Sequence, residues 1–246
     1  MKYLGVPLVT TRLIFRDCKE LVEKLSNRIN DWRNKSLSFA GRLQLIQSVL
    51  SSMHIYWASV FILPARIVYD LEQLMRGFLW SSSNGQKGKS KVAWEVVCLP
   101  KQEGWLGIRR LESFNTALIA AHIWRLFNSM DSLWVKWIHT YRLRGRNFWD
   151  VPCRGNLSWS WRKILQIWPL VRQFFWYNIG NGLKASAWFD KWCSIGPLSH
   201  TVSSRDIHRA GFSSNSLVRD IILEDSWAWP NAWGIRYPIH LFLLLF

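Results

Sequence analysis

An uncharged stretch from Leu43 to Ala65 limits the possible folds more than any other feature of the sequence, because 23 consecutive residues carry no formal charge. A stretch of this length is long enough to span a bilayer. However, Pro64 lies at its end and polar side chains are spread through it, namely Gln44, Gln47, Ser48, Ser51, Ser52 and His54. We therefore expect a buried core helix and regard a membrane span as the weaker alternative.

Helices are also predicted on both sides of this stretch. Before it, apolar residues at helical spacing form one core-facing stripe, made by Phe15, Cys18, Leu21, Val22, Leu25, Ile29 and Trp32. The central helix is expected to begin at Ser36 or Ser38, since both are good N-cap residues. A third helix follows, and its core side is made by Ile67, Leu71, Leu74, Met75 and Phe78. Three consecutive helices with short connections predict a small bundle.

The net charge of +16 is concentrated in the first 180 residues. Residues 1–180 hold 26 Lys and Arg against 11 Asp and Glu, whereas residues 181–246 hold 6 against 5. A basic body favours a polyanionic partner, with nucleic acid first and an acidic membrane surface second. The four cysteines are scattered and form no CxxC pair, which is typical of reduced, buried thiols. With no secretory signal visible, we expect an intracellular protein of the nucleus or cytoplasm that is not secreted.

Basic residues recur on the outer face of the first predicted helix. Arg12, Arg16 and Lys19 stand at positions i, i+4 and i+7, so they would form a row on one helix face that could contact phosphates. The same face carries acidic residues such as Glu20 and Glu23. An ordinary solvated surface is the simpler interpretation, and both remain open.

Tryptophan and basic residues alternate in the second half of the chain. Residues 124–176 contain eight Trp and nine Lys or Arg but only two acids, a composition that can stack bases and pair with phosphates. We prefer the alternative that these Trp belong to the core, because Trp134 with Trp137 and Trp161 with Trp168 have helical spacing. A helix is predicted over residues 111–128 and a β-hairpin with a Gly-Asn-Gly turn over residues 176–192.

No combination of residues in the sequence supports catalysis. No GxSxG, P-loop or GxGxxG motif occurs. Asp190 is interpreted as an ion-pair partner or a cap. His200 and His208 follow Cys193 at spacings that match no metal site. We therefore expect no catalytic residue, no metal ligand, no cofactor and no small-molecule substrate.

Several motifs, taken in order, resemble one family. They are KYLGVPL at 2–8, WRNKSLSFAGRLQLIQSVL at 32–50, LPARIVYDLEQLMRGFLW at 63–80, KVAWEVVCLPKQEGWLGIRRLESFNTALIAAHIWRL at 91–126, WSWRKIL at 159–165, and IGNG with AWFDKW at 179–192. Together they resemble the C-terminal part of reverse transcriptases from non-LTR, LINE-type retrotransposons of the kind abundant in plants. The similarity covers roughly residues 2–233.

The resemblance implies a location within a polymerase. KYLGVPL would end the palm, residues 12–80 would form the thumb that grips the primer–template duplex, and later residues would lead to a Cys/His zinc-binding region. It also implies nucleic-acid backbone contacts from Arg12, Arg16, Lys19, Lys35 and Arg42. We expect the basic linker to add contacts from Lys87, Lys89 and Lys91. The family's polymerase uses Mg²⁺, but its paired catalytic Asp residues precede KYLGVPL and are not part of this sequence.

These observations predict a mainly α fold, with a small thumb-like three-helix bundle followed by a mixed, mostly helical basic region and a short β-hairpin. The predicted regions are 1–80 (palm end and thumb), 81–91 (basic linker), 92–175 (Trp/Arg-rich linker region) and 176–246 (hairpin and truncated C-terminal region). We expect a catalytically inactive polymerase fragment that retains nonspecific RNA/DNA backbone binding. The alternatives are a retroelement remnant without a binding role and, more weakly, a basic membrane-surface protein.

Overall fold

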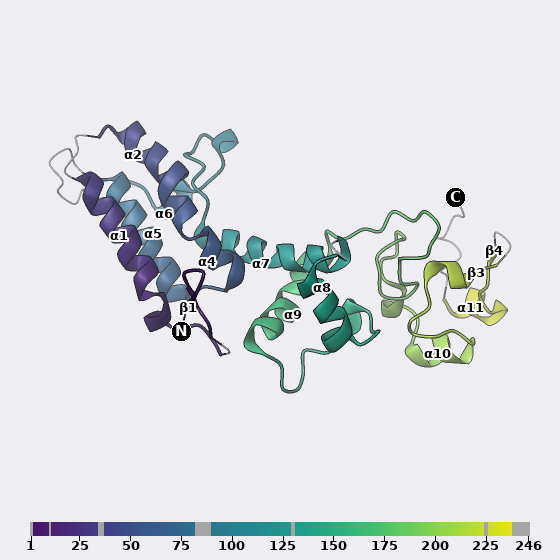
Figure 1. The fold of residues 1–246 in the computed structure, drawn as a ribbon. Coiled ribbons are helices and arrows are strands. Elements are labelled where there is room, and N and C mark those ends of the chain that lie inside the picture. Colours follow the sequence, from purple (N-terminus) through teal and green to yellow (C-terminus); the bar gives the residue numbers. More distant parts are fainter. Residues whose placement is uncertain are drawn as a thin grey trace. The chain divides into compact units, whose positions relative to one another are not determined.

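The computed structural model describes residues 2–9, 11–33, 37–81, 90–128, 131–223 and 226–237. These residues are mainly helical and contain two small antiparallel strand pairs, as Figure 1 shows. The predicted fold class is therefore confirmed. The chain divides into two compact units, the first made by residues 1–124 and 156–164 and the second by residues 125–155 and 165–246.

The first unit begins with a short hairpin. Strand β1 (Lys2–Tyr3) pairs with β2 (Val6–Pro7) in antiparallel register, with Tyr3 opposite Val6. Leu4 and Gly5 both have positive φ, at 49° and 83°, which is the backbone conformation of a tight two-residue hairpin turn. The KYLGVPL motif therefore folds as a tight hairpin.

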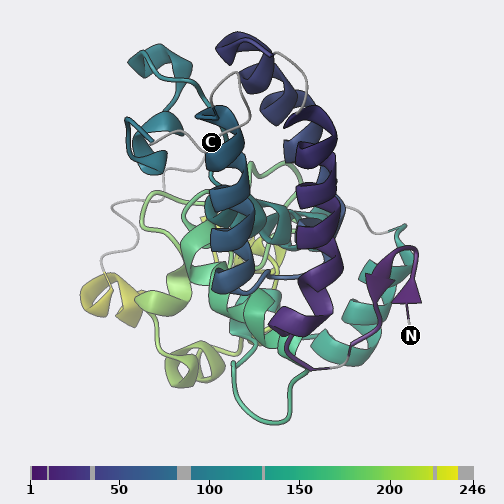
Figure 2. The same cartoon turned by 90° about the vertical axis from the view of Figure 1, so that its left-hand side faces the viewer.

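Three helical segments follow the hairpin. A 3₁₀ turn, η1 (Phe15–Cys18), leads into α1 (Lys19–Arg33), and α5 is the third segment (Ala65–Leu79). The second segment is built from four pieces, namely α2 (Phe39–Leu45), the π-helical η2 (Ile46–Leu50), α3 (Ser51–Met53) and α4 (Ile55–Val60). Helices α1 and α5 lie side by side in both views (Figures 1 and 2). This arrangement confirms the predicted bundle.

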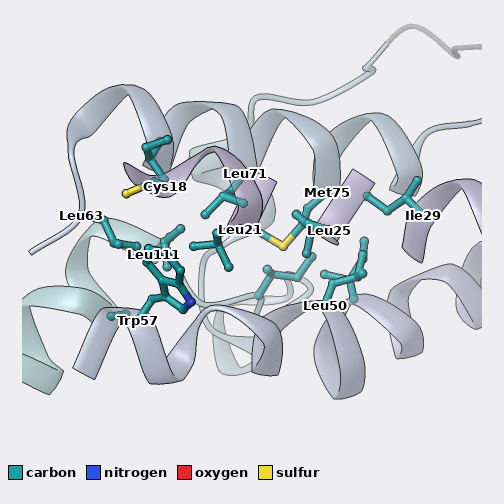
Figure 3. Packing of buried hydrophobic residues seen from close by; sticks show 14 of the residues in the cluster. Cys18, Leu21, Leu25, Ile29, Leu50, Trp57, Leu63, Leu71, Met75 and Leu111 are labelled. Carbon is teal, nitrogen blue, oxygen red and sulfur yellow. The ribbon is translucent and has the colours of Figure 1, made fainter. Parts of the chain in front are cut away.

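The bundle core is aliphatic and close to what the helical spacing predicts. Leu21, Leu25 and Ile29 of α1 are at most 2% exposed, and they pack with Leu71 and Met75 of α5 (Figure 3). Phe15 is an exception, because its side chain is 46% exposed while Leu13 is buried in the core. Phe15 begins the 3₁₀ turn η1 and regular α-helix starts only at Lys19, so the α-helical spacing does not extend back to Phe15.

The uncharged stretch forms a helical run that is interrupted before its predicted end. Ser38 is its N-cap, and the Ser38 hydroxyl accepts a hydrogen bond from the Gly41 amide at 3.1 Å, whereas Ser36 lies outside the described residues. The run turns at His54 and ends at Val60, and Pro64 then precedes α5. Among the described residues, no helix is long and apolar enough to cross a membrane.

A buried amide connects the bundle to the next long helix, α7 (Leu111–Asn128), whose bounds agree with the prediction. Asn115 of α7 is 3% exposed; its Oδ1 accepts from the Leu63 amide at 2.8 Å, and its Nδ2 donates to the carbonyls of Ala58 and Phe61 at 2.6 and 2.8 Å. The amide therefore satisfies backbone groups left at the end of α4. Between α5 and α7 lie α6 (Trp94–Val97) and η3 (Lys101–Glu103).

The second unit has shorter elements and a second core. Its first part contains α8 (Leu133–Trp137), the π-helical η4 (Ile138–Leu143) and η5 (Phe148–Asp150), and α9 (Trp159–Arg172) contributes from residue 165 onward. The elements that follow are η6 (Leu198–His200), α10 (Ser204–Arg209), η7 (Val218–Ile221), β3 (Ile222–Leu223), β4 (Ser226–Trp227) and α11 (Asn231–Arg236). Trp188, at 0% exposed, lies in the core of this last part.

The hairpin predicted over residues 176–192 does not form as two paired strands. Its ends do meet, because the Tyr177 amide donates to the Lys191 carbonyl at 2.9 Å. Between them the chain turns and pairs elsewhere: the Ala187 amide donates to Ser216 and the Val218 amide to Ala185, both at 3.0 Å. The strand partner is therefore a distant segment, which local turn chemistry does not indicate. The second strand pair is β3 with β4 instead.

Candidate nucleic-acid interface

The three basic residues at the start of the bundle do not share one helix. Arg12 lies in the non-helical segment before η1, Arg16 lies in the 3₁₀ turn, and Lys19 is the first residue of α1. The predicted row at i, i+4 and i+7 is therefore wrong as a helical face, because regular α-helix begins only at Lys19. All three side chains are nevertheless exposed, and they lie within eight residues of one another at the same end of the bundle.

The outer face of α1 is largely neutralised by its own acids. Lys19 Nζ lies 3.3 Å from a Glu23 carboxylate oxygen, and Glu20 pairs with Lys24 at 2.9 Å and with Lys2. The hydrogen bond from Lys2, followed by that from Lys24, lowers the pKa of Glu20. The interpretation as an ordinary solvated face therefore suits Lys19.

Arg12 and Arg16 differ from Lys19 in this respect. Neither side chain forms an ion pair or a hydrogen bond with any residue that the structure describes. An exposed guanidinium without an acidic partner keeps its full positive field and all its donors for an external anion. This arginine pair, Arg12 and Arg16, is the strongest phosphate-binding candidate in the first unit.

Arg42 lies at the opposite end of the bundle. The ring contacts of Trp32 with Phe78 (5.9 Å) and of Phe39 with Trp80 (5.5 Å) join the end of α1 and the start of α2 to the end of α5. Arg42 belongs to this end: its side chain is half-buried and Nη1 donates to Ser81 Oγ at 3.5 Å. The structure thus does not bring Arg42 together with the arginine pair.

The remaining predicted residues are Lys35 and the three lysines of the basic linker. Lys91 is exposed and precedes α6. Lys35, Lys87 and Lys89 lie outside the described residues. No single surface formed by all the predicted residues is therefore described, and the arginine pair remains the best-defined part.

The tryptophans of residues 124–176 divide between core and surface. Trp149 and Trp161 are buried, as the core interpretation expects. The pair Trp134 and Trp137 contradicts it, with exposed fractions of 36% and 45%. Helical spacing is satisfied here by other side chains, since α8 and η4 bury Val135, Ile138 and Leu143. Spacing alone could not show which of two apolar faces is covered.

A buried carboxylate organises the second unit. Asp190 Oδ1 accepts from the Trp149 indole Nε1 at 2.9 Å, and Oδ2 accepts from the Ser186 amide at 2.7 Å. Burial raises the pKa of Asp190 to about 6, although these hydrogen bonds and the Arg172 charge oppose the shift. Both carboxylate oxygens accept hydrogen bonds, so Asp190 joins the Trp149 indole to the backbone at Ser186; among the described residues it forms no ion pair, which was one of the two roles expected from the sequence. The Trp149–Asp190 pair itself had no sequence signal.

A cavity of about 710 Å³ lies beside this carboxylate. Its lining includes His139, Arg146, Lys184 and Asp190. The His139 Nε2 is already within hydrogen-bonding distance of the Leu126 carbonyl, at 3.1 Å. Within the described part of the chain, no group of three or more His, Cys, Asp and Glu side chains is arranged to hold a metal ion.

The sequence predicted that the cysteine thiols are buried, but the four differ in their exposure. Cys18 and Cys193 are buried, Cys98 is half-buried and Cys153 is exposed. Burial raises the pKa of Cys18 and of Cys98 to about 12. These two thiols are therefore protonated at neutral pH and unreactive as nucleophiles.

Two plant proteins are similar to this chain. The “Putative ribonuclease H protein” of Arabidopsis thaliana is 38% identical over 198 residues, which are 78% of this chain and 32% of that protein. An uncharacterized mitochondrial protein of the same plant is 28% identical over 142 residues, which are 57% of this chain and 92% of that protein. This chain therefore spans about a third of the length of the first relative. No family model matches the sequence.

Proposed function

We propose that these 246 residues derive from a plant retroelement and correspond to the thumb and linker of a non-LTR, LINE-type reverse transcriptase. Their activity is nonspecific binding of the RNA or DNA backbone, with the arginine pair of the first unit as a principal contact. The single observation that carries this function is the exposed arginine pair, which has no acidic partner among the described residues, whereas Lys19 and Lys24 on the neighbouring face of α1 are ion-paired.

The retroelement origin is supported by the order of the sequence motifs together with the similarity to plant proteins. One relative carries the name of a ribonuclease, which denotes an enzyme that acts on RNA. The three-helix bundle of the first unit also has the size and helical content that the resemblance to a thumb leads us to expect. Backbone binding suits such an element, because a polymerase must hold any sequence.

We further propose that these residues do not polymerise DNA by themselves. Two-metal nucleotidyl transfer requires paired carboxylates that hold the metal ions. No Tyr-Ala-Asp-Asp-type turn occurs in the 246 residues. A primer-extension assay with the purified chain is expected to show no product, and extension above the background of a protein-free reaction would contradict the proposal.

The binding function is tested by titrating a labelled RNA–DNA hybrid against salt. If about 6–10 phosphates are contacted, affinity falls by about 10³–10⁵-fold between about 50 and 200 mM salt. Replacing both arginines (Arg12→Ala with Arg16→Ala) is expected to weaken binding for every sequence and to reduce the salt slope by about two. A response that does not change with salt would overturn the proposal.

Arg66 provides a matched control for this experiment. It is exposed on α5, but its Nε lies 3.1 Å from an Asp70 carboxylate oxygen, so its charge is already compensated. The Arg66→Ala variant is expected to bind the hybrid as the unmodified chain does. Equal losses in both variants would mean that any surface charge matters and that the arginine pair is not a contact.

A remnant without a binding role is the second candidate, and the ion pairs of Lys19 and Lys24 favour it. On that account the basic charge is inherited and partly compensated within the chain. It predicts hybrid binding no tighter than that of an unrelated basic protein of equal net charge. The salt titration separates the two candidates.

A further inference from the structure

The helical run of α8 and η4 in the second unit exposes aromatic rings. Its buried side is complete without them, since Val135, Ile138 and Leu143 are at most 3% exposed. The rings of Trp137 and Tyr141 are 45% and 60% exposed. A short helix that already has its core contacts gains nothing for folding by exposing large rings, and exposed apolar groups of this kind indicate binding surfaces.

The exposed rings lie next to one another and next to a cation. The ring centroids of Trp137 and Tyr141 are 5.9 Å apart, with an angle of 32° between their planes. The Arg142 guanidinium carbon lies 5.4 Å from the Trp137 ring centroid. We call the group formed by Trp134, Trp137, Tyr141 and Arg142 the α8–η4 surface. It offers flat rings and a positive charge within one patch.

The segment that carries this surface is strongly basic. Residues 132–149 contain four basic residues and no Asp or Glu; the basic residues are Lys136, Arg142, Arg144 and Arg146. Within the described ranges none of the four forms an ion pair. Arg144 ends the helix with a positive φ of 51°, and its Nε donates to the Tyr141 carbonyl at 3.2 Å. The turn that ends the helix therefore places the Arg144 guanidinium next to the Tyr141 backbone, close to the rings.

We propose that the α8–η4 surface binds single-stranded RNA or DNA by stacking bases on its rings while the neighbouring cations pair with phosphates. Unpaired bases present ring faces to solvent, whereas bases in a duplex are already stacked on each other. An anionic lipid surface also accepts rings beside cations, so vesicle binding is measured below to separate the two occupants. The surface has no element that selects a particular base.

This inference goes beyond the proposed duplex contact, and it depends on residues of the other unit. The arginine pair belongs to the first unit, and the α8–η4 surface belongs to the second. The duplex contact is electrostatic and is weakened by salt, whereas stacking persists at higher salt. The two proposals can therefore fail separately.

The experiment measures fluorescence anisotropy with the full chain and two probes. One is a labelled oligothymidylate of about 20 nucleotides, and the other is a blunt RNA–DNA hybrid of similar length. The double variant Trp137→Ala with Tyr141→Ala is expected to bind the single strand about 10- to 100-fold more weakly at high salt as well as low salt. Its affinity for the hybrid should stay within about twofold, because base faces in a duplex are not available.

Two single variants keep the test informative if the double variant is unstable. Trp137→Phe retains a stacking face and should recover most of the single-strand affinity. Arg142→Gln retains the rings and should reduce the salt slope by about one. Circular dichroism verifies that each variant keeps its helical content.

Two matched controls distinguish stacking on the rings from nonspecific binding to any exposed apolar side chain. Tyr69 on α5 is 53% exposed and lies 5.8 Å from the Arg66 guanidinium, but that cation is paired with Asp70. Leu133, at the start of α8, is 85% exposed and has no π face. Tyr69→Ala and Leu133→Ser are both expected to leave single-strand binding unchanged.

Three outcomes would overturn the inference. The first is single-strand affinity unchanged in the double variant. The second is a loss in Leu133→Ser as large as that in the double variant, which would mark an apolar protein-docking face. The third is binding of the unmodified chain to anionic vesicles, abolished by the double variant, without binding to the oligothymidylate; it would mark a lipid-binding face.

Discussion

The cores of the two units are built from different side chains. In the first unit, mainly aliphatic residues of three helical segments pack against one another, and most of the backbone of these segments is hydrogen-bonded within the helices. In the second unit, indoles fill the core and also donate hydrogen bonds: Trp188 Nε1 to the Ser213 carbonyl at 2.7 Å, and Trp192 Nε1 to the Ala187 carbonyl at 3.0 Å. There, side chains satisfy loop backbone that no regular element satisfies.

The difference shows where irregular structure obtains its stability. A chain with few regular elements must pair its buried carbonyls with side-chain donors, since unpaired ones are costly. Trp supplies both a donor and a large apolar area, so it suits this task. The high Trp content of the chain, 18 residues in 246, is therefore partly a consequence of how the second unit folds.

Removing the central indole should have the largest effect on stability. Trp188→Ala leaves a cavity and an unpaired Ser213 carbonyl, so we expect the free energy of unfolding of the second unit to fall by about 3–5 kcal/mol. Hydrogen exchange measured by mass spectrometry should show lost amide protection in residues 185–233, with little change in α1 and α5. Equal loss in both units would contradict the description of two separate cores.

A buried histidine in the first unit and a buried carboxyl group in the second should respond to acid in opposite ways. Burial lowers the pKa of His54 in the first unit to about 4 and raises that of Asp190 in the second to about 6. As pH falls from about 6.5 to 4, His54 becomes protonated in the unfolded state but stays neutral in the folded state. The free energy of unfolding of the first unit therefore falls by up to about 3 kcal/mol. Folded Asp190 becomes protonated at a higher pH than unfolded Asp190, so the free energy of unfolding of the second unit rises by a similar amount over the same pH range.

Urea titrations at about pH 4.5 and pH 7 test these opposing effects. On acidification, His54→Gln should lose less stability than the unmodified chain, because it lacks the histidine penalty. Asp190→Asn should lose more, because it lacks the carboxyl gain. If both variants shift in the same direction, at least one of the two groups is not buried in the way described.

A smaller effect on stability is expected at Gly182, which lets its own turn lie close to the backbone of η7 in the second unit. Gly182 has a φ of +69°, and a Cβ there would lie 2.8 Å from the Arg219 amide nitrogen. Gly182→Ala should therefore cost about 2 kcal/mol from backbone strain and displacement of η7. Gly180 is the control, because a Cβ there meets nothing within 4 Å; Gly180→Ala should leave the midpoint of thermal unfolding within about 2 °C.

The regular parts of the fold could be predicted because their information is local. The stripe through Leu21, Leu25 and Ile29 and the cap at Ser38 depend on spacing and on one side chain. What was missed depends on distant partners. Asn115 anchors residues more than 50 positions away, and residues 185–187 pair with residues 216–218 instead of with their own hairpin.

The candidate site was predictable only in part for the same reason. The sequence identifies Arg12 and Arg16 as basic residues. Whether a basic side chain forms an ion pair, however, depends on its neighbours, as Lys19 with Glu23 and Arg66 with Asp70 show. Helical spacing marked Trp134 and Trp137 as one face, yet only the packing of Val135 and Ile138 shows that this face is exposed.

Ultraviolet cross-linking with peptide mapping tests the central claim most directly. The probe is an RNA–DNA hybrid with a single-stranded overhang, mixed with the full chain, followed by digestion and mass spectrometry. Nucleotide adducts are expected on peptides that contain Arg12 or Arg16 for the duplex part and on peptides that contain Trp137 or Tyr141 for the overhang. Absence of adducts, or adducts only on peptides from the ion-paired faces of α1 and α5, would contradict the account.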